Sequence, residues 1–232
     1  GKGTVEDLIE RGDRAGIDRF IVQSVATTPR QVASINNFIA TSVAANPERL
    51  VGLGTLHPES EDIKGDVEQI IALGLKGVKL HPDIQAFKID DYRCLKIYEL
   101  CEEKGLPVLM HTGDNRYDYS NPNRLVPVLK IYKNLTVIGA HFGGWSVYDE
   151  GVKYLLSEEN CMVDTSSTSG FTTPEKFDEL IHTFGADRLL FGSDFPMWDP
   201  KGELQRFMEV KMSDDDREKV LYNNAAKILG IK

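Results

Sequence analysis

Four histidines and one aspartate follow the ends of predicted β-strands, and side chains of these types can hold a catalytic metal ion. They are His57, His81, His111, His141 and Asp194. In a barrel of parallel strands the carboxyl ends share one face, so side chains far apart in the sequence converge on one pocket. Imidazoles and a carboxylate can ligate a zinc-type ion that keeps one coordination position for water or substrate. The residue pattern therefore predicts a metal-dependent enzyme.

The chemistry expected of such a site is proton transfer next to a metal ion. A divalent ion lowers the pKa of bound water to roughly 7 and polarises carbonyl groups, and a neighbouring imidazole titrates in the range needed to carry the proton. A histidine at a strand end can instead cap the sheet by bonding to a loop carbonyl. His57 and His81 each precede a proline, so a turn-forming role competes there with substrate contact. His182 lies within a predicted helix and is interpreted as structural.

Lys79 shares strand parity with His81, so both side chains are expected to point the same way. A lysine there could be carbamylated and bridge two ions, or could form a Schiff base with a carbonyl substrate. The favoured interpretation is that Lys79 contacts an anionic substrate or is buried against a carboxylate such as Asp164.

The loops that follow the later strands are expected to line the rim of the pocket. Arg116 could bind a substrate carboxylate, and Trp145 or Trp198 could stack on a planar substrate. Ordinary packing of these side chains on the rim is the competing interpretation.

Composition indicates one globular domain over residues 1–232. The chain has 41% hydrophobic residues and a net charge of -9, which argues against nonspecific binding to nucleic acid or anionic membrane. We therefore expect a small-molecule substrate, with a homodimer as the candidate assembly. The 3 cysteines show no CxxC spacing and are interpreted as reduced, buried thiols. Since no signal-peptide pattern is present either, a cytoplasmic location is expected.

Strand-like and helix-like segments alternate along the chain, and this alternation indicates βα units in a parallel α/β sheet. The strands are expected at 19–24, 50–55, 77–80, 107–110, 136–139, 161–163 and 188–191. The intervening helices are expected at 30–45, 62–73, 92–104, 124–132, 147–156 and 174–184.

Seven strands are predicted, whereas a closed (β/α)8 barrel of the TIM type needs eight. The chain opens on a helix, with Thr4 as its cap and a stop near Gly16. Because a helix that leads into a strand is the second half of a βα unit, the first strand of the barrel is expected to be missing from this chain. The first and last strands would then expose unpaired edges that something must cover.

Five motifs resemble the amidohydrolase-related branch of the amidohydrolase superfamily, which includes aminocarboxymuconate-semialdehyde decarboxylase and metal-dependent hydrolases. The motifs are GVKLHPD at 77–83, PVLMHTG at 107–113, AHFGG at 140–144, LLFGSDFP at 189–196 and NNAAKILGI at 223–231. The resemblance runs from about Ile17 onward, and it is the order and spacing of the motifs that make it specific.

The resemblance implies roles for three residues. His111 corresponds to a metal ligand, Asp194 to a metal ligand that can also take a proton from water, and His141 to a metal ligand or a general acid or base. The implied cofactor is a divalent ion, zinc in the first place and manganese in the second. The His-x-His pair that completes the ligand set in this family is absent from the sequence, so the ion is expected to be weakly held or missing.

Three functional hypotheses follow. The leading one is a metal-dependent hydrolase, or a nonoxidative decarboxylase, acting on a small carboxylated organic molecule, with Asp194 and His141 as the acid–base residues. The second is a Schiff-base lyase that uses Lys79 and needs no metal. The third is a metal-poor, noncatalytic fragment.

Overall fold

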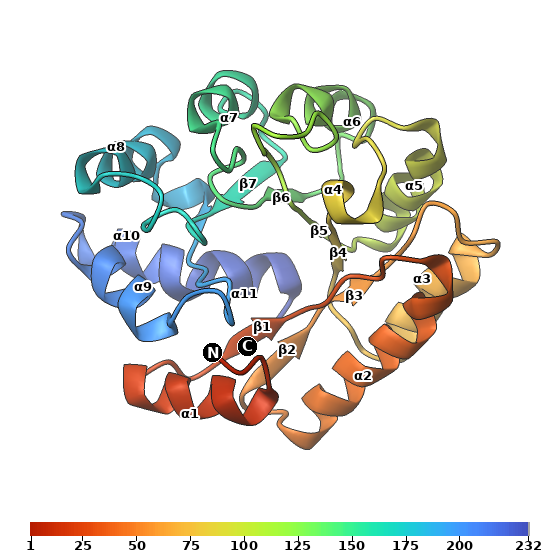
Figure 1. Cartoon of the computed structure of the whole chain (residues 1–232), viewed down its shortest axis with the longest axis horizontal. Helices are drawn as coiled ribbons and strands as arrows, with labels where there is room; N and C mark the ends of the chain where they lie inside the picture. The colour runs from red at the N-terminus through yellow and green to blue at the C-terminus, as the bar shows by residue number, and fades with distance from the viewer. Residues whose placement is uncertain (232) are drawn as a thin grey trace.

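The computed structural model describes residues 1–231 and consists of short parallel strands surrounded by helices (Figure 1). The strands form a pair, β1-β2, and a six-stranded sheet in the order β3-β4-β5-β6-β7-β8. Their bounds are β1 Phe20–Val22, β2 Leu50–Gly52, β3 Gly54–Thr55, β4 Val78–Leu80, β5 Val108–Met110, β6 Val137–Gly139, β7 Cys161–Asp164 and β8 Leu189–Leu190. Every pairing is parallel, as the βα alternation predicted.

Helices connect successive strands and form the outer layer of the molecule (Figure 1). The α-helices are α1 Val5–Ala15, α2 Val32–Ala45, α3 Ile63–Ala72, α4 Pro82–Gln85, α5 Leu95–Lys104, α6 Leu125–Ile131, α7 Tyr148–Leu155, α8 Pro174–Phe184, α9 Pro200–Met208, α10 Asp214–Glu218 and α11 Asn224–Leu229. Short 3-10 segments are η1 Pro29–Gln31, η2 Tyr92–Cys94, η3 Pro122–Arg124 and η4 Ala186–Arg188, and η5 Lys219–Asn223 is a π-helix. Each predicted helix is present within a few residues of its expected bounds.

The second predicted strand, 50–55, is divided at Leu53. Its first part, β2, pairs with β1, whereas its second part, β3, pairs with β4. The helices press closely on it, since a Cβ at Gly54 would lie 2.6 Å from a side-chain atom of Ile70. Glycine is therefore required here by the close approach of α3.

Strand alternation separates an outer face, which packs against the helices, from an inner face that carries Lys79 together with apolar side chains such as Leu109. Val78 and Leu80 on β4, like Val108 and Met110 on β5, are fully buried in the core that the helices cover. The alternate side chains, Lys79 on β4 among them, point to the other face. The polar residues of the site therefore come from the barrel interior.

The strands do not close into a ring, because β1 and β8 form no pair with each other. The C-terminal part of the chain packs beside this opening. The Phe191 N–H, just after β8, donates to the Val220 carbonyl oxygen at 2.9 Å. Leu229 of α11 forms a small hydrophobic cluster with Val51 and Leu53, which alternation places on the inner face. The C-terminal segment therefore covers part of the unpaired strand edges, as the sequence predicted that some segment must.

Helix α1 begins and ends where the sequence predicted. The Thr4 side chain caps it by accepting from the Asp7 N–H, and Gly16 ends it in the left-handed conformation. The helix packs against α9, and the Gly1 ammonium group donates to the Pro196 carbonyl oxygen at 2.9 Å in the loop after β8.

All three cysteines are free and buried, which confirms the predicted reduced thiols. Over residues 1–231, none of the helices has the length and apolar character that crossing a membrane would require.

Candidate metal centre

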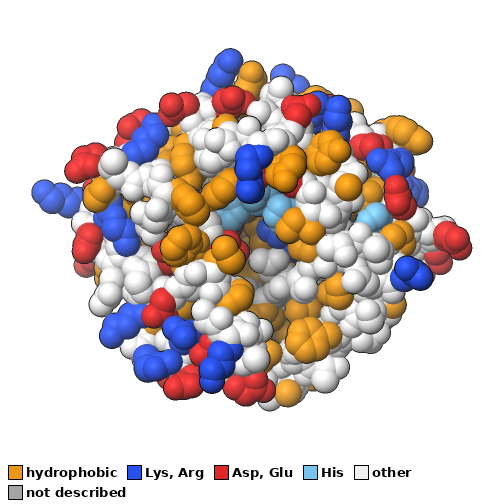
Figure 2. Space-filling model, viewed as in Figure 1, with side chains coloured by type: hydrophobic (Ala, Val, Ile, Leu, Met, Phe, Trp, Pro, Cys, Tyr) orange, Lys and Arg blue, Asp and Glu red, His pale blue; other side chains and the backbone are white. Residues whose placement is uncertain are grey.

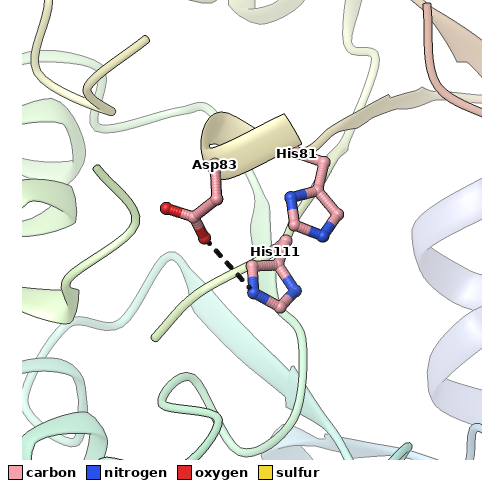
Figure 3. Close-up of side chains that lie close together, drawn as sticks. All are labelled: His81, Asp83 and His111. Carbon is pink, nitrogen blue, oxygen red and sulfur yellow. Dashed lines mark ion pairs between the residues drawn. The ribbon is translucent and has the colours of Figure 1, made fainter. Parts of the chain in front are cut away.

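Three side chains from neighbouring strand ends form a compact cluster, shown in Figure 3. His81 directly follows β4, Asp83 lies in α4, and His111 directly follows β5. One potential ligand atom from each residue lies within 4.8 Å of the other two. The imidazole rings of His81 and His111 are stacked with centroids 3.8 Å apart, and His111 Nε2 lies 3.5 Å from Asp83 Oδ2.

The local sequence explains why Asp83 reaches this cluster. Pro82 starts a helix immediately after the strand because its fixed φ suits the first helical position. The Gln85 amide group then fixes α4 by donating to the carbonyl oxygens of Ala26 and Leu56, at 2.9 Å and 2.8 Å. Ser120 also donates a hydrogen bond of 2.6 Å to Asp83 Oδ2. The carboxylate is therefore held in place from two sides.

The cluster contains buried polar atoms that have no hydrogen-bond partner. They are His81 Nδ1, Asp83 Oδ1 and His111 Nε2. Each unsatisfied buried group costs about 1–3 kcal/mol, which is why such atoms are rare in native proteins. A divalent cation accepts lone pairs from imidazole and carboxylate ligands, so one ion would satisfy all three atoms. The residues present therefore fit the divalent metal that the sequence predicted.

Hydrogen bonds around His141 assign the proton positions in the imidazoles. His141 Nδ1 lies 2.9 Å from the Ser166 carbonyl oxygen, which can only accept, so Nδ1 carries the proton. In the neutral ring Nε2 is then the acceptor, and it faces His111 Nδ1 at 3.1 Å. His111 must therefore donate from Nδ1, which leaves its Nε2 with a lone pair directed toward Asp83. His111 Nε2 and Asp83 Oδ2 are both lone-pair donors, so a cation bound between them would stabilise this arrangement.

Burial keeps these imidazoles neutral. It lowers the pKa of His81 to about 3, with a smaller effect from the Lys79 charge. Burial also lowers the pKa of His111 well below its usual value, and that of His141 in the same direction against the opposing charge of Asp164. Burial raises the pKa of Asp83, against the hydrogen bond from Ser120. Neutral imidazole is the form that binds metal ions, so the site is prepared for a cation at neutral pH.

Asp194 lies outside the three-residue cluster. Its Oδ2 accepts a hydrogen bond of 2.6 Å from Ser167 Oγ, which in turn accepts one of 2.9 Å from Trp198 Nε1. The charge of Asp194 opposes the lowering of the pKa of both His81 and His141, so it is part of the same electrostatic environment. Joint coordination of one ion by His111 and Asp194 stays a prediction.

Several residues other than glycine adopt a strained backbone at this end of the barrel, and three of them belong to or contact the predicted catalytic residues. His141, Ser167 and Asp194 have φ values of 60°, 48° and 55°, in the left-handed region. For residues other than glycine this conformation costs of order 1–3 kcal/mol, and it concentrates at functional sites. The strain occurs in the loops after β6, β7 and β8, where the predicted catalytic residues lie.

Lys79 is only 6% exposed, and the residues described include no ion-pair partner for it. Burial lowers the pKa of its ammonium group, while the charges of Asp164 and Asp194 raise it. The side chain is therefore buried within the electrostatic influence of Asp164 and Asp194, and a contact between Lys79 and an anionic substrate stays a prediction.

The remaining predicted residues lie around the cluster. His57 is buried in the turn after β3, where its Nδ1 accepts from the Glu59 N–H at 3.2 Å, as its predicted turn-forming role requires. Arg116 lies on the loop after β5, and its guanidinium group forms two hydrogen bonds with Asp114, of 2.9 Å and 2.7 Å. It also lies 5.6 Å from the ring centroid of Trp145. Substrate contact by His57, His81, Arg116 and Trp145 stays a prediction.

Asp83 is the member of the cluster that the sequence analysis missed. The adjacent proline suggested a turn, and a turn would not direct residue 83 toward His111. Pro82 instead occupies the first position of helix α4. Asp83 therefore lies in the first turn of that helix, which directs its side chain toward His111 at the strand end. The His-Pro-Asp sequence directly after a strand was the available signal.

The surface above the cluster is hollowed. Figure 2 shows histidine side chains at the upper edge of a central depression, with hydrophobic side chains around it. His57, His111 and His141 are buried, so this face exposes only small parts of the strand-end histidines.

Solved structures with the same fold support this architecture. An uncharacterised TIM-barrel protein from Bordetella bronchiseptica is 26% identical, with a TM-score of 0.82 over 98% of this chain and 83% of that chain. A 5-carboxyvanillate decarboxylase from Sphingomonas paucimobilis is 19% identical, with a TM-score of 0.81 over 97% and 83%. A dihydroxybenzoic acid decarboxylase from Polaromonas, with bound manganese and 2-nitroresorcinol, is 19% identical, with a TM-score of 0.77 over 98% and 86%.

No curated protein sequence matches the chain significantly. Comparison with protein-family models identifies the family, because residues 4–231 match the amidohydrolase family. This match confirms the resemblance that the strand-end motifs indicated, and the solved structures confirm the predicted barrel-type α/β fold. The chain therefore belongs to the amidohydrolase family.

Proposed function

We propose that this protein is a divalent-metal-dependent enzyme that removes a carboxyl group from a small, planar, carboxylated organic molecule. The observation that carries the proposal is the lone pair of His111 Nε2, which faces the Asp83 carboxylate at 3.5 Å with no proton donor between them. Structures of similar fold that are named as aromatic-acid decarboxylases support the reaction type. Manganese, which one of them contains, is the first ion to test, with zinc as the alternative.

In this proposal His81, Asp83 and His111 hold the ion, and His141 orients His111 from behind. Asp194 is the further ligand to test. The predicted ligand role of His141 would require its Nε2 to leave His111, because Nδ1 is engaged with the Ser166 carbonyl oxygen. A bound divalent ion would bind and polarise an oxygen atom of the substrate. The protein must also deliver a proton to the carbon atom that loses carbon dioxide. Asp194 is assigned to this step because Ser167 holds only its Oδ2, leaving Oδ1 directed to no partner in residues 1–231. Its carboxylate would first take a proton from solvent and then pass that proton to the carbon atom as carbon dioxide leaves.

The rim would select the substrate. Asp114 holds the Arg116 guanidinium through Nε and one terminal nitrogen, which leaves the other terminal nitrogen for a substrate carboxylate. Trp145 lies beside Arg116, and Phe171 packs edge-on against both Trp145 and Trp198, with centroids 5.1 Å and 5.5 Å apart. An aromatic wall of this kind favours a planar substrate.

Metal content and turnover test the proposal together. The protein is reconstituted with manganese or zinc, its metal content is measured, and carbon dioxide release is followed with a panel of hydroxylated benzoates. We expect about one ion per chain, with both the ion and the activity lost in His111→Ala but retained in the exposed control His182→Ala. A wild-type chain that binds neither ion under these conditions would exclude the metal mechanism.

Hydrolysis is the second candidate, because Asp194 could take a proton from water as readily as deliver one to carbon. The same panel, extended to lactones and amides of carboxylated compounds, separates the two. Product that forms without carbon dioxide release would assign the hydrolytic reaction.

A Schiff-base lyase is a third candidate, favoured by the buried position of Lys79 and its lowered pKa. This enzyme would keep its activity after metal removal and would be inactivated by borohydride in the presence of substrate. A Lys79→Met variant that retains turnover would exclude it.

A further inference from the structure

One carboxylate outside the metal cluster collects hydrogen bonds from two loops. Asp164 lies at the end of β7 and is buried. Its Oδ1 accepts from the His141 N–H at 3.0 Å, from the Ser166 N–H at 3.0 Å and from Ser166 Oγ at 2.5 Å. A single oxygen atom therefore connects the loop after β6 with the loop after β7.

These bonds act on the two features that orient His141. The first is its backbone, whose φ of 60° is unfavourable for a residue with a Cβ and is held by the N–H bond to Asp164. The second is its ring, because Nδ1 lies 2.9 Å from both the carbonyl oxygen and Oγ of Ser166. Asp164 fixes Ser166 through two bonds, so it also fixes the acceptor that the ring of His141 faces.

The consequence reaches the metal cluster through the imidazoles. With its proton on Nδ1, His141 presents the Nε2 lone pair to His111 Nδ1 at 3.1 Å. His111 then keeps its own Nε2 free of a proton. If His141 adopted the other tautomer, His111 would have to accept at Nδ1, and its Nε2 would carry a proton toward the cation site.

We propose that Asp164 and Ser166 are positioning residues that select the tautomer of His141 and thereby leave the Nε2 lone pair of His111 free for a cation. The inference rests on the proposed function only for its effect on metal affinity. The tautomer itself can be measured in the metal-free protein.

The test is long-range 1H–15N correlation of histidine-labelled protein, which the 5 histidines of the chain make tractable. Signals are assigned with His141→Asn and His111→Asn. In the metal-free wild type we expect both residues to be protonated at Nδ1 and not at Nε2. A wild-type His141 that carries its proton on Nε2 would overturn the proposal.

Two variants test the positioning residues separately. Asp164→Asn removes the charge that strengthens the three hydrogen bonds to Oδ1. Ser166→Ala removes the bond from Oγ, one of the two by which Asp164 holds Ser166. We expect each to give His141 a mixture of tautomers and to weaken manganese binding about 10–100-fold, the range typical of groups that orient metal ligands. The exposed control Asp149→Asn should change neither quantity. Unchanged tautomers in both folded variants would refute the inference.

Asp164 could instead serve only as a counter-charge for buried Lys79, whose pKa it raises. The double variant Lys79→Met with Asp164→Asn distinguishes the two roles. If Asp164 acts through Ser166 and His141, the tautomer mixture persists in the double variant. If it acts only on Lys79, the wild-type tautomer returns, and the positioning role is excluded.

Failure of the proposed function has a different signature. A wild-type chain that shows the expected tautomers but binds no divalent ion would reject the metal-dependent mechanism and leave the positioning role intact. A chain that binds the ion with His141 protonated at Nε2 would reject the positioning role and leave the metal-dependent mechanism intact.

Discussion

Replacing Asp83 with asparagine should have opposite effects on stability in the absence and in the presence of metal. Without an ion the carboxylate is unfavourable, because its side chain is only 5% exposed and Oδ1 has no partner. Asparagine is nearly the same size. With its amide nitrogen in the place of Oδ2, it can donate to His111 Nε2, and the Ser120 hydroxyl group can accept from it instead of donating. Removing one unsatisfied buried group and adding one hydrogen bond should stabilise the metal-free protein by about 1–3 kcal/mol.

With an ion bound, the sign reverses. Loss of the charged ligand should weaken binding by at least the roughly 10–100-fold seen when a supporting group is removed, or about 1.4–2.7 kcal/mol. Because ligand binding stabilises the folded state through mass action, this loss appears directly in the unfolding free energy. The metal-induced increase in stability should therefore be smaller in Asp83→Asn than in the wild type.

Thermal and urea unfolding, each with chelator and with saturating manganese, measure both effects. For a domain of this size, about 1 kcal/mol corresponds to roughly 2–4 °C in Tm. Asp149→Asn is the matched control, because that carboxylate is 88% exposed, lies in α7 and is not a member of the cluster. If Asp83→Asn destabilises the chelated protein while its manganese-induced shift equals that of the wild type, the metal-site assignment is wrong.

Three further predictions concern stability and reactivity. The pKa of His81 is about 3 in the folded protein and 6.5 in an exposed histidine, so between these pH values the unfolded chain binds more protons than the folded one. The unfolding free energy should therefore fall as the pH drops through this window, by up to ~1.4 kcal/mol per pH unit for this group. His81→Gln should flatten that slope in urea titrations, and parallel slopes would contradict the assignment. Burial raises the pKa of each cysteine to about 12, so the thiols should react with a disulfide reagent only after unfolding, and rapid labelling of native protein would contradict their burial. Gly54→Ala should cost about 1–3 kcal/mol in chemical unfolding, since the new Cβ would meet Ile70 at 2.6 Å, and an unchanged unfolding midpoint would show that α3 can move away.

Much of the fold could be predicted because it depends on local signals. The spacing of β-rich runs and helical segments indicated parallel βα units, and the cap residues of α1 marked both of its ends. The division of the second strand could not be predicted in this way. It depends on which neighbour each half pairs with, and no property of residues 50–55 alone specifies that choice.

The site was predicted in part, for a similar reason. Residues directly after strands, such as His81 and His111, must lie at one end of the barrel, and the structure brings them into contact. Asp83 was missed because its position depends on α4 being held by Gln85, whose amide contacts Ala26 and Leu56 on distant loops. Long-range hydrogen bonds of this kind leave no periodic trace in a sequence.

The sequence by itself determined the order of strands and helices, the end of the barrel at which the polar residues gather, and the chemical character of those residues, because propensity, capping and alternation act over a few neighbouring positions. Only the tertiary structure decided which nitrogen of each histidine carries the proton and which carboxylate faces His111. Those properties depend on atoms in the segments that follow β4, β5, β6 and β7, which come close to one another only when the chain folds.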